Sequence, residues 1–283
     1  MKTNPITTLT ATFAALLIAV LALPGISRAA TIYTYDGNGA DAKIVQTSND
    51  GSTTLGNMDA NFGADERIGA RTWDDGDGDT QRYEAVLLRF DISGYNSGSF
   101  TDDSTLGLTL HRDNDVSMDL FVYGLNDGLD DWVEGNKTGE NGEDDELTYN
   151  NAPGIEQDEV AGDSDLDHDS SETTDLLATF KNFTGDEGEE ITVASSDITT
   201  FLNADSDGLV TFLILREHST GTGQFHDFAS KETTSLEGGS ITGDAGDFAP
   251  SLTFDGTVIP EPTTLALLLF GGAALLRRPR QRR

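Results

Sequence analysis

Apolar and polar residues alternate in short runs through residues 30–259, and turns rich in Gly, Asp and Asn separate the runs. The strongest runs are residues 83–90 and 209–216, while in 106–110 and 116–122 every second residue is apolar. A period of two is typical of strands with one buried face. The pattern predicts an all-β fold, an antiparallel β-sandwich.

Two local expectations refine this fold. Residues 106–110 and 116–122 are expected to pair as a hairpin, turning through Arg112-Asp113-Asn114-Asp115. Around residues 196–203, apolar residues recur at i, i+3 and i+4 behind a Ser or Asp cap, which predicts a single short helix.

Long acidic loops interrupt the strand pattern at residues 136–146 and 157–172. Because they contain many carboxylates and few apolar residues, neither can bury much surface. We expect both to be mobile insertions. A shorter motif, Asp205-Ser206-Asp207-Gly208, is interpreted as a turn before a strand.

Both ends of the chain carry hydrophobic segments with flanking signals. Lys2, the mostly apolar residues 9–23 and the small Ala29 predict a signal peptide over residues 1–29, removed by signal peptidase. At the other end, Pro260, Glu261 and Pro262 precede an apolar run and a terminal arginine cluster. The prolines favour an extended segment that a processing enzyme can bind.

The C-terminal apolar segment is short. Residues 263–276 would span about 21 Å as a helix, against a hydrocarbon core of about 30 Å. The arginines that follow would stay cytoplasmic, which leaves the preceding chain outside the inner membrane. A transient membrane anchor is expected, and a permanent anchor is the alternative.

The order of these parts over residues 258–283 resembles the PEP-CTERM sorting signal of Gram-negative bacteria. The resemblance implies processing by a membrane protease of the exosortase type. It also implies delivery to the cell surface or the extracellular matrix.

Charge restricts the partners. The whole chain has a formal net charge of −33, and residues 30–259 hold 49 acidic against 10 basic residues, or −39. Such a surface repels phosphates, so nucleic acid is not an expected partner. The chain has no cysteine, so disulfides are excluded. A saline habitat or bound Ca²⁺ would each account for the excess of acids.

A second resemblance covers nearly all of residues 30–257, taken as one domain. Short segments occur in the order seen in DNRLRE-type domains: 59–63, 67–69, 84–93, 132–135, 147–153, 197–199, 210–216, 228–232 and 250–254. The resemblance implies a jelly-roll-like β-sandwich related to carbohydrate-binding modules, some of which bind alginate-type polysaccharides. The chain departs from the pattern in its acidic loops and in Tyr149, where Trp is usual.

One acidic motif has the ligand spacing that Ca²⁺ prefers. Asp74, Asp75, Asp77 and Asp79 alternate with glycines that permit a tight turn. An EF-hand would need an acid at the position that Ala85 occupies, so the candidates are a different type of calcium site or a solvated acidic hairpin loop. Residues 163–169 are a weaker version of the same pattern.

Aromatic rings are the candidates for glycan contacts. Trp73, Tyr83 and Tyr123 could stack on sugar rings if exposed, whereas Trp132 and Tyr149 are expected in the core. The four histidines are too scattered for a zinc site, and no nucleophile elbow or phosphate-binding glycine loop occurs.

Three functional hypotheses follow. The first is a non-catalytic surface or matrix protein that binds polysaccharide, with Ca²⁺ bridging or a neutral glycan overcoming the acidic surface. The second is a structural coat or adhesion protein that binds no glycan. The third is a polysaccharide lyase or hydrolase, which is disfavoured because ten basic residues leave few groups to neutralise a uronate.

Overall fold

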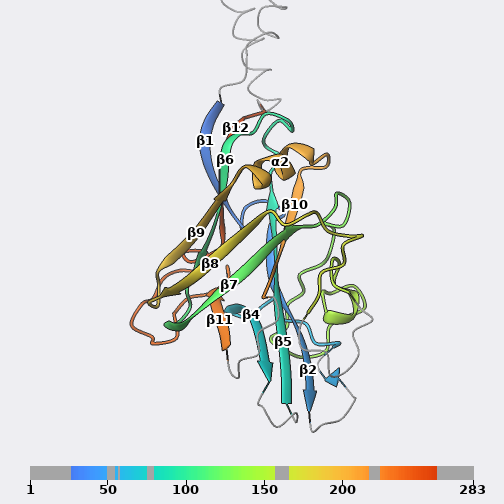
Figure 1. The fold of residues 1–283 in the computed structure, drawn as a ribbon, viewed down its shortest axis with the longest axis vertical. Helices are drawn as coiled ribbons and strands as arrows, with labels where there is room; N and C mark the ends of the chain where they lie inside the picture. Colours follow the sequence, from blue (N-terminus) through green and yellow to red (C-terminus); the bar gives the residue numbers. More distant parts are fainter. Residues whose placement is uncertain are drawn as a thin grey trace, which may run out of the picture. The chain divides into compact units, whose positions relative to one another are not determined.

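Two antiparallel sheets pack face to face in the computed structural model, which describes residues 27–49, 55–56, 58–74, 80–156, 166–216 and 224–259. Residues 29–256 form one compact unit, and the two chain ends form the other. The predicted all-β, antiparallel sandwich is confirmed (Figure 1).

The smaller sheet has four strands in the order β1-β12-β6-β9. Its strands are β1 (Ser27–Tyr33), β12 (Ser251–Thr257), β6 (Thr101–Thr109) and β9 (Glu190–Ser195).

The larger sheet has the order β11-β4-β5-β10-β7-β8, and β2 and β3 extend it beside β5. Its strands are β2 (Ala40–Asn49), β3 (Leu55–Gly56), β4 (Arg67–Asp74), β5 (Thr80–Asp91), β7 (Asn114–Gly124), β8 (Ala178–Gly185), β10 (Leu209–Leu215) and β11 (Gln224–Ala229). The edge strands β8 and β9 of the two sheets lie side by side (Figure 1).

Strand β10 is buried on both faces. Phe212 and Ile214 pack into the core between the sheets, and Leu213 and Leu215 pack under the loops that cover the outer face. This double burial explains why residues 209–215 read as a nearly continuous apolar run.

The short helix α2 (Ser196–Ala204) follows β9 directly and confirms the predicted helix. The hydroxyl of Ser195 accepts a hydrogen bond from the Asp197 amide and caps the first turn. Ile198 and Leu202 are buried, and the ring of Phe201 lies 5.3 Å from that of Phe212. A 3₁₀ turn, η1 (Tyr149–Asn151), is the second helical element described.

The predicted hairpin between residues 106–110 and 116–122 is wrong. Strand β6 pairs with β12 and β9 in one sheet, whereas β7 pairs with β10 and β8 in the other. The link between them crosses from sheet to sheet, and the His111 amide donates to the Asp227 carbonyl while the Arg112 guanidinium binds the Asp227 carboxylate. A polar link has the same composition whether it turns within one sheet or crosses between two.

The acidic segment 136–146 is not a free insertion. It packs around the fully buried Asn61, whose backbone exchanges hydrogen bonds with Gly139 and Glu140 and whose side chain accepts from the Lys137 amide. In the second acidic loop, residues 157–165 lie outside the described part, and Leu166 is buried in the outer cluster. No helix among the described residues has the length and apolar character needed to cross a membrane.

Candidate functional site

Several predicted site residues lie outside the described part of the chain. These are the sorting motif Pro260, Glu261 and Pro262, and the calcium candidates Asp75, Asp77 and Asp79. Asp74 and Trp73 end β4, but their side chains are likewise outside what the structure describes.

The two tyrosines predicted for glycan stacking are buried. Tyr83 is 2% exposed and Tyr123 is 5% exposed, and the Tyr123 ring stacks on His168 at 4.0 Å. Neither ring offers the exposed face that sugar stacking requires, because loops cover this face of the larger sheet. Trp132 and Tyr149 are core residues, as expected.

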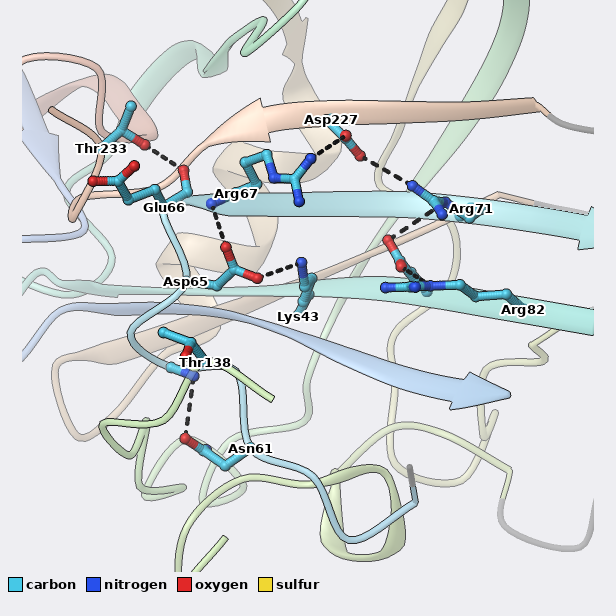
Figure 2. A network of polar contacts seen from close by, with 12 residues as sticks. Lys43, Asn61, Asp65, Glu66, Arg67, Arg71, Arg82, Thr138, Asp227 and Thr233 are labelled. Carbon is cyan, nitrogen blue, oxygen red and sulfur yellow. Dashed lines mark hydrogen bonds and ion pairs between the residues drawn. The ribbon is translucent and has the colours of Figure 1, made fainter. Parts of the chain in front are cut away.

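Four arginines converge on two buried carboxylates at β4, β5 and β11, and we call Arg67, Arg71, Arg82 and Arg112 the arginine cluster. Arg67, Arg71 and Arg112 reach Asp227 at 3.7, 3.8 and 2.6 Å. Arg71 also lies 3.7 Å from Glu84, which Arg82 binds as well. Figure 2 shows Asp227 between Arg67 and Arg71.

The register of the strands builds this cluster. Arg71 stands opposite Glu84 across β4 and β5, and Asp227 stands opposite Gly69 across β4 and β11. Opposed residues of antiparallel strands project from the same face. A Cβ at Gly69 would lie 2.8 Å from Asp227 Oδ1 and 3.1 Å from Glu84 Oε2. The missing side chain therefore gives both carboxylates room between the flanking arginines.

The arginines of the cluster are more exposed than the carboxylates that they bind. Asp227 and Glu84 are nearly fully buried, whereas the Arg67 side chain is 44% exposed and that of Arg82 is 32% exposed. Burial lowers the pKa of Arg71, and the two carboxylates oppose that shift. Among the described residues, the four guanidinium groups face three carboxylates, since Arg112 also lies 3.5 Å from Glu237, so one positive charge is in excess here on a strongly acidic chain.

Residues distant in sequence form a second charged group, which we call the lysine cluster: Asp41, Glu134, Lys231 and Glu232. The three carboxylates bring oxygens within 4.8 Å of one another. Lys231 Nζ binds Glu134 Oε2 at 2.5 Å, and the Lys231 amide donates to Asp41. Burial, followed by the charge of Glu134, raises the pKa of Asp41 to about 7. The cluster thus contains its own cation.

The neighbouring residues His226 and Asp227 do not form a catalytic pair. They alternate along β11, and the His226 ring is fully buried beside Phe183, with centroids 4.3 Å apart. Burial lowers the pKa of His226 to about 3, so the ring is neutral in the core. The Asp227 carboxylate instead forms ion pairs with Arg67, Arg71 and Arg112 of the arginine cluster.

One local pattern in β4 points to the arginine cluster. Arg67, Gly69 and Arg71 follow the period of two, so they share a face of one strand. Arg82 comes from β5, and Arg112 comes from the link between β6 and β7. Only the folded arrangement of these segments brings both arginines to the two carboxylates.

No protein-family model and no curated protein matches the chain. The resemblances to PEP-CTERM signals and DNRLRE-type domains therefore stay predictions from the residues.

Proposed function

We propose that this protein is a non-catalytic, surface-delivered β-sandwich that binds an anionic polysaccharide at the arginine cluster. The observation that carries the proposal is the concentration of four arginines around Asp227 and Glu84. Guanidinium groups bind carboxylates and sulfates through paired N–H donors, and partly exposed arginines can do so without losing their buried partners.

The arginine cluster changes the expected mode of binding. Net charge alone favours a neutral glycan or bridging by Ca²⁺, because −39 repels a polyanion. At physiological ionic strength, charges beyond about 8 Å are largely screened, so a local cluster of arginines can act within an acidic surface. Direct contact with uronate groups is the mode we propose.

Delivery is part of the same proposal. The signal peptide over residues 1–29 and the sorting signal over 258–283 would export the protein through signal peptidase and an exosortase-type protease. The C-terminal segment would anchor it transiently in the inner membrane before release to the cell surface or matrix. Replacing Pro260, Glu261 and Pro262 with alanine should retain the protein in the membrane fraction.

Affinity electrophoresis of the protein through gels containing alginate, a polyuronate, tests the binding proposal. The double variant Arg67→Gln, Arg82→Gln should bind about thirtyfold more weakly, since each of the two lost charged hydrogen bonds contributes about 1 kcal/mol or more. Lys181→Gln, which removes an exposed charge on β8, should bind like the wild type.

Two results would contradict the proposal. Equal retardation of the double variant and the wild type would show that the arginine cluster does not bind the polysaccharide. Loss of binding in a chelator would favour bridging by Ca²⁺. Failure to bind alginate, sulfated or neutral polysaccharides would favour the alternative of a structural coat or adhesion protein. In that case the arginines would serve to neutralise Glu84 and Asp227.

A further inference from the structure

A third charged group lies at the opposite end of α2 from its cap, and we call Asp127, Asp130, Asp205 and Asp207 the aspartate cluster. Asp127 and Asp130 follow β7, while Asp205 and Asp207 lie in the turn between α2 and β10. Asp127, Asp130 and Asp207 bring carboxylate oxygens within 4.8 Å of one another. Asp205 lines the same cavity as Asp127 and Asp130.

Asp130 is the member of the aspartate cluster whose environment most favours a bound cation. It is 2% exposed, and its Oδ1 has no hydrogen-bond partner. An unpartnered buried carboxylate oxygen costs free energy unless a proton or a cation satisfies it. The side chain of Thr211 hydrogen-bonds the carboxylate, and the Thr211 hydroxyl accepts from Trp132 Nε1 at 3.1 Å. This chain of bonds fixes the orientation of the carboxylate.

The other carboxylates are also held in place by hydrogen bonds from their own loop. The Leu209 amide donates to Asp207 Oδ1 at 2.9 Å, and the Gly208 amide donates to Asp205 Oδ2 at 2.9 Å. The Ser206 hydroxyl donates to Asp127 Oδ2. A cation would therefore find its ligands already ordered.

No ion pair among the described residues neutralises these four aspartates. The Arg89 guanidinium donates instead to the main-chain carbonyls of Asp130 and Trp132, at 2.8 and 2.6 Å. Helix α2 also ends here without a basic residue in its last turn, and the C-terminus of a helix carries partial negative charge. The electrostatic potential favours a cation.

The cavity beside the aspartate cluster has a volume of about 110 Å³ and is lined by Phe201, Ala204 and Leu209 as well as the carboxylates. A water molecule needs about 10–15 Å³, so the space can hold a hydrated ion. Ca²⁺ takes six to eight oxygen ligands at about 2.3–2.6 Å, which places ligands of one ion up to roughly 5 Å apart. Three carboxylates within 4.8 Å, completed by water, fit that coordination.

We propose that the aspartate cluster is a binding site for a divalent cation, Ca²⁺ by preference, with Asp127, Asp130 and Asp207 as ligands and Asp205 as a charged neighbour. The site joins the loop after β7 to the turn before β10. It is distinct from the acidic motif at residues 74–79 and does not depend on glycan binding.

The two tryptophans provide a specific test. Trp132 is linked through Thr211 to Asp130, so Tb³⁺ bound in place of Ca²⁺ should show luminescence sensitised by Trp132. Trp73 adjoins the other acidic motif in sequence and would sensitise an ion there. Wild type, Trp132→Phe, Trp73→Phe, Asp130→Asn and the matched charge control Asp131→Asn are titrated with Tb³⁺ in about 0.15 M salt, which screens loose binding.

We expect luminescence in the wild type, Trp73→Phe and Asp131→Asn proteins, with loss of the signal in Trp132→Phe. Asp130→Asn should weaken Ca²⁺ binding about tenfold or more in calorimetry, because ligand charge sets affinity at such sites. Trp132→Phe should still bind Ca²⁺ calorimetrically, which separates loss of the antenna from loss of the site. Luminescence that is lost in Trp73→Phe and unchanged by Asp130→Asn would overturn the proposal, as would the absence of Ca²⁺ binding to the wild type.

Discussion

The lysine cluster and the aspartate cluster are both groups of carboxylates drawn from distant parts of the chain, yet their charges are balanced differently. In the lysine cluster, Lys231 reaches Glu134 at 2.5 Å and its amide binds Asp41. In the aspartate cluster, the described residues supply hydroxyl and amide donors and no lysine or arginine ion pair. Each cluster has one buried carboxylate oxygen without a hydrogen-bond partner, Glu232 Oε2 in the first and Asp130 Oδ1 in the second, but only the first contains an ammonium group.

A count of acids therefore does not locate a cation site. Three carboxylates lie within 4.8 Å of one another in both clusters. What separates the clusters is the presence of an internal ammonium group. Substitutions in one cluster leave the other as a reference, whereas a change of pH titrates both.

The largest effect is expected from Lys231→Met, which leaves the carboxylates of the lysine cluster without their cation. Breaking a buried ion pair in this way costs about 3 kcal/mol. Urea unfolding at pH 7 measures the loss, with Lys181→Met as the exposed control, expected to stay within about 0.5 kcal/mol of the wild type. Equal stability of the two variants would show that Lys231 does not balance the cluster.

The next largest effect is expected in the pH dependence of the free energy of unfolding. Burial raises the pKa of Asp41 and of Asp130 to about 7, with neighbouring acids adding to both shifts. Between about pH 4 and pH 7 the folded state then holds protons that the unfolded chain has released. The free energy of unfolding in chelator is therefore highest at the acidic end of this window and falls as pH rises, by at least about 2 kcal/mol between pH 5 and pH 8.

Ca²⁺ should change the contribution of the aspartate cluster to this pH dependence and leave that of the lysine cluster unchanged. Because protons compete with the cation for Asp130, Ca²⁺ should raise the free energy of unfolding more at pH 8 than at pH 5. Asp130→Asn should remove the Ca²⁺ effect while retaining the fall due to Asp41. An equal Ca²⁺ effect at both pH values would argue against a buried carboxylate as ligand.

A smaller effect is expected from Ser195→Ala, which removes the cap of α2. Loss of such a cap costs about 1 kcal/mol. Since Asp205 of the aspartate cluster is the C-cap residue of α2, Ca²⁺ should restore part of the loss, whereas Lys231→Met should receive no selective benefit from Ca²⁺. Thermal unfolding with and without Ca²⁺ compares the two variants. If Ca²⁺ stabilises Ser195→Ala and the wild type by the same amount, the stability of α2 does not depend on the aspartate cluster.

The smallest effect is expected from Glu232→Gln in the lysine cluster. Burial and the nearby Asp41 and Glu134 raise the pKa of Glu232 to about 8. The group is therefore mostly protonated at pH 7, and the neutral amide should change stability by less than about 0.5 kcal/mol. At pH 9 the variant should be the more stable protein, because the wild type then ionises a buried acid. A destabilised variant at pH 9 would reverse the assigned direction of the pKa shift.

The fold followed from local pattern, but the pairing of its strands did not. The alternation in residues 83–90 and the capped spacing in 196–203 depend on neighbouring residues, so the sequence could predict a strand and a helix there. The link at Arg112 connects two sheets because its guanidinium binds Asp227, which lies 115 positions later in the chain. A contact at that separation leaves no periodic signal.

The same limit applies to the proposed cation site. The alternating acids at residues 74–79 form a pattern because their spacing is local, while the spacing in Asp205-Ser206-Asp207-Gly208 predicts only a turn. Its hydrogen bonds confirm the turn, with Gly208 at a φ of +91°. Asp127 and Asp130, which complete the aspartate cluster, come from another strand end almost 80 residues earlier, so spacing could not join them.

A crystal of the protein grown with Tb³⁺ and measured for anomalous scattering would test the difference between the two clusters most directly. We predict an anomalous peak within bonding distance of Asp127, Asp130 and Asp207, and none among Asp41, Glu134 and Glu232. A peak in the lysine cluster, or an aspartate cluster without one at saturating Tb³⁺, would contradict the account.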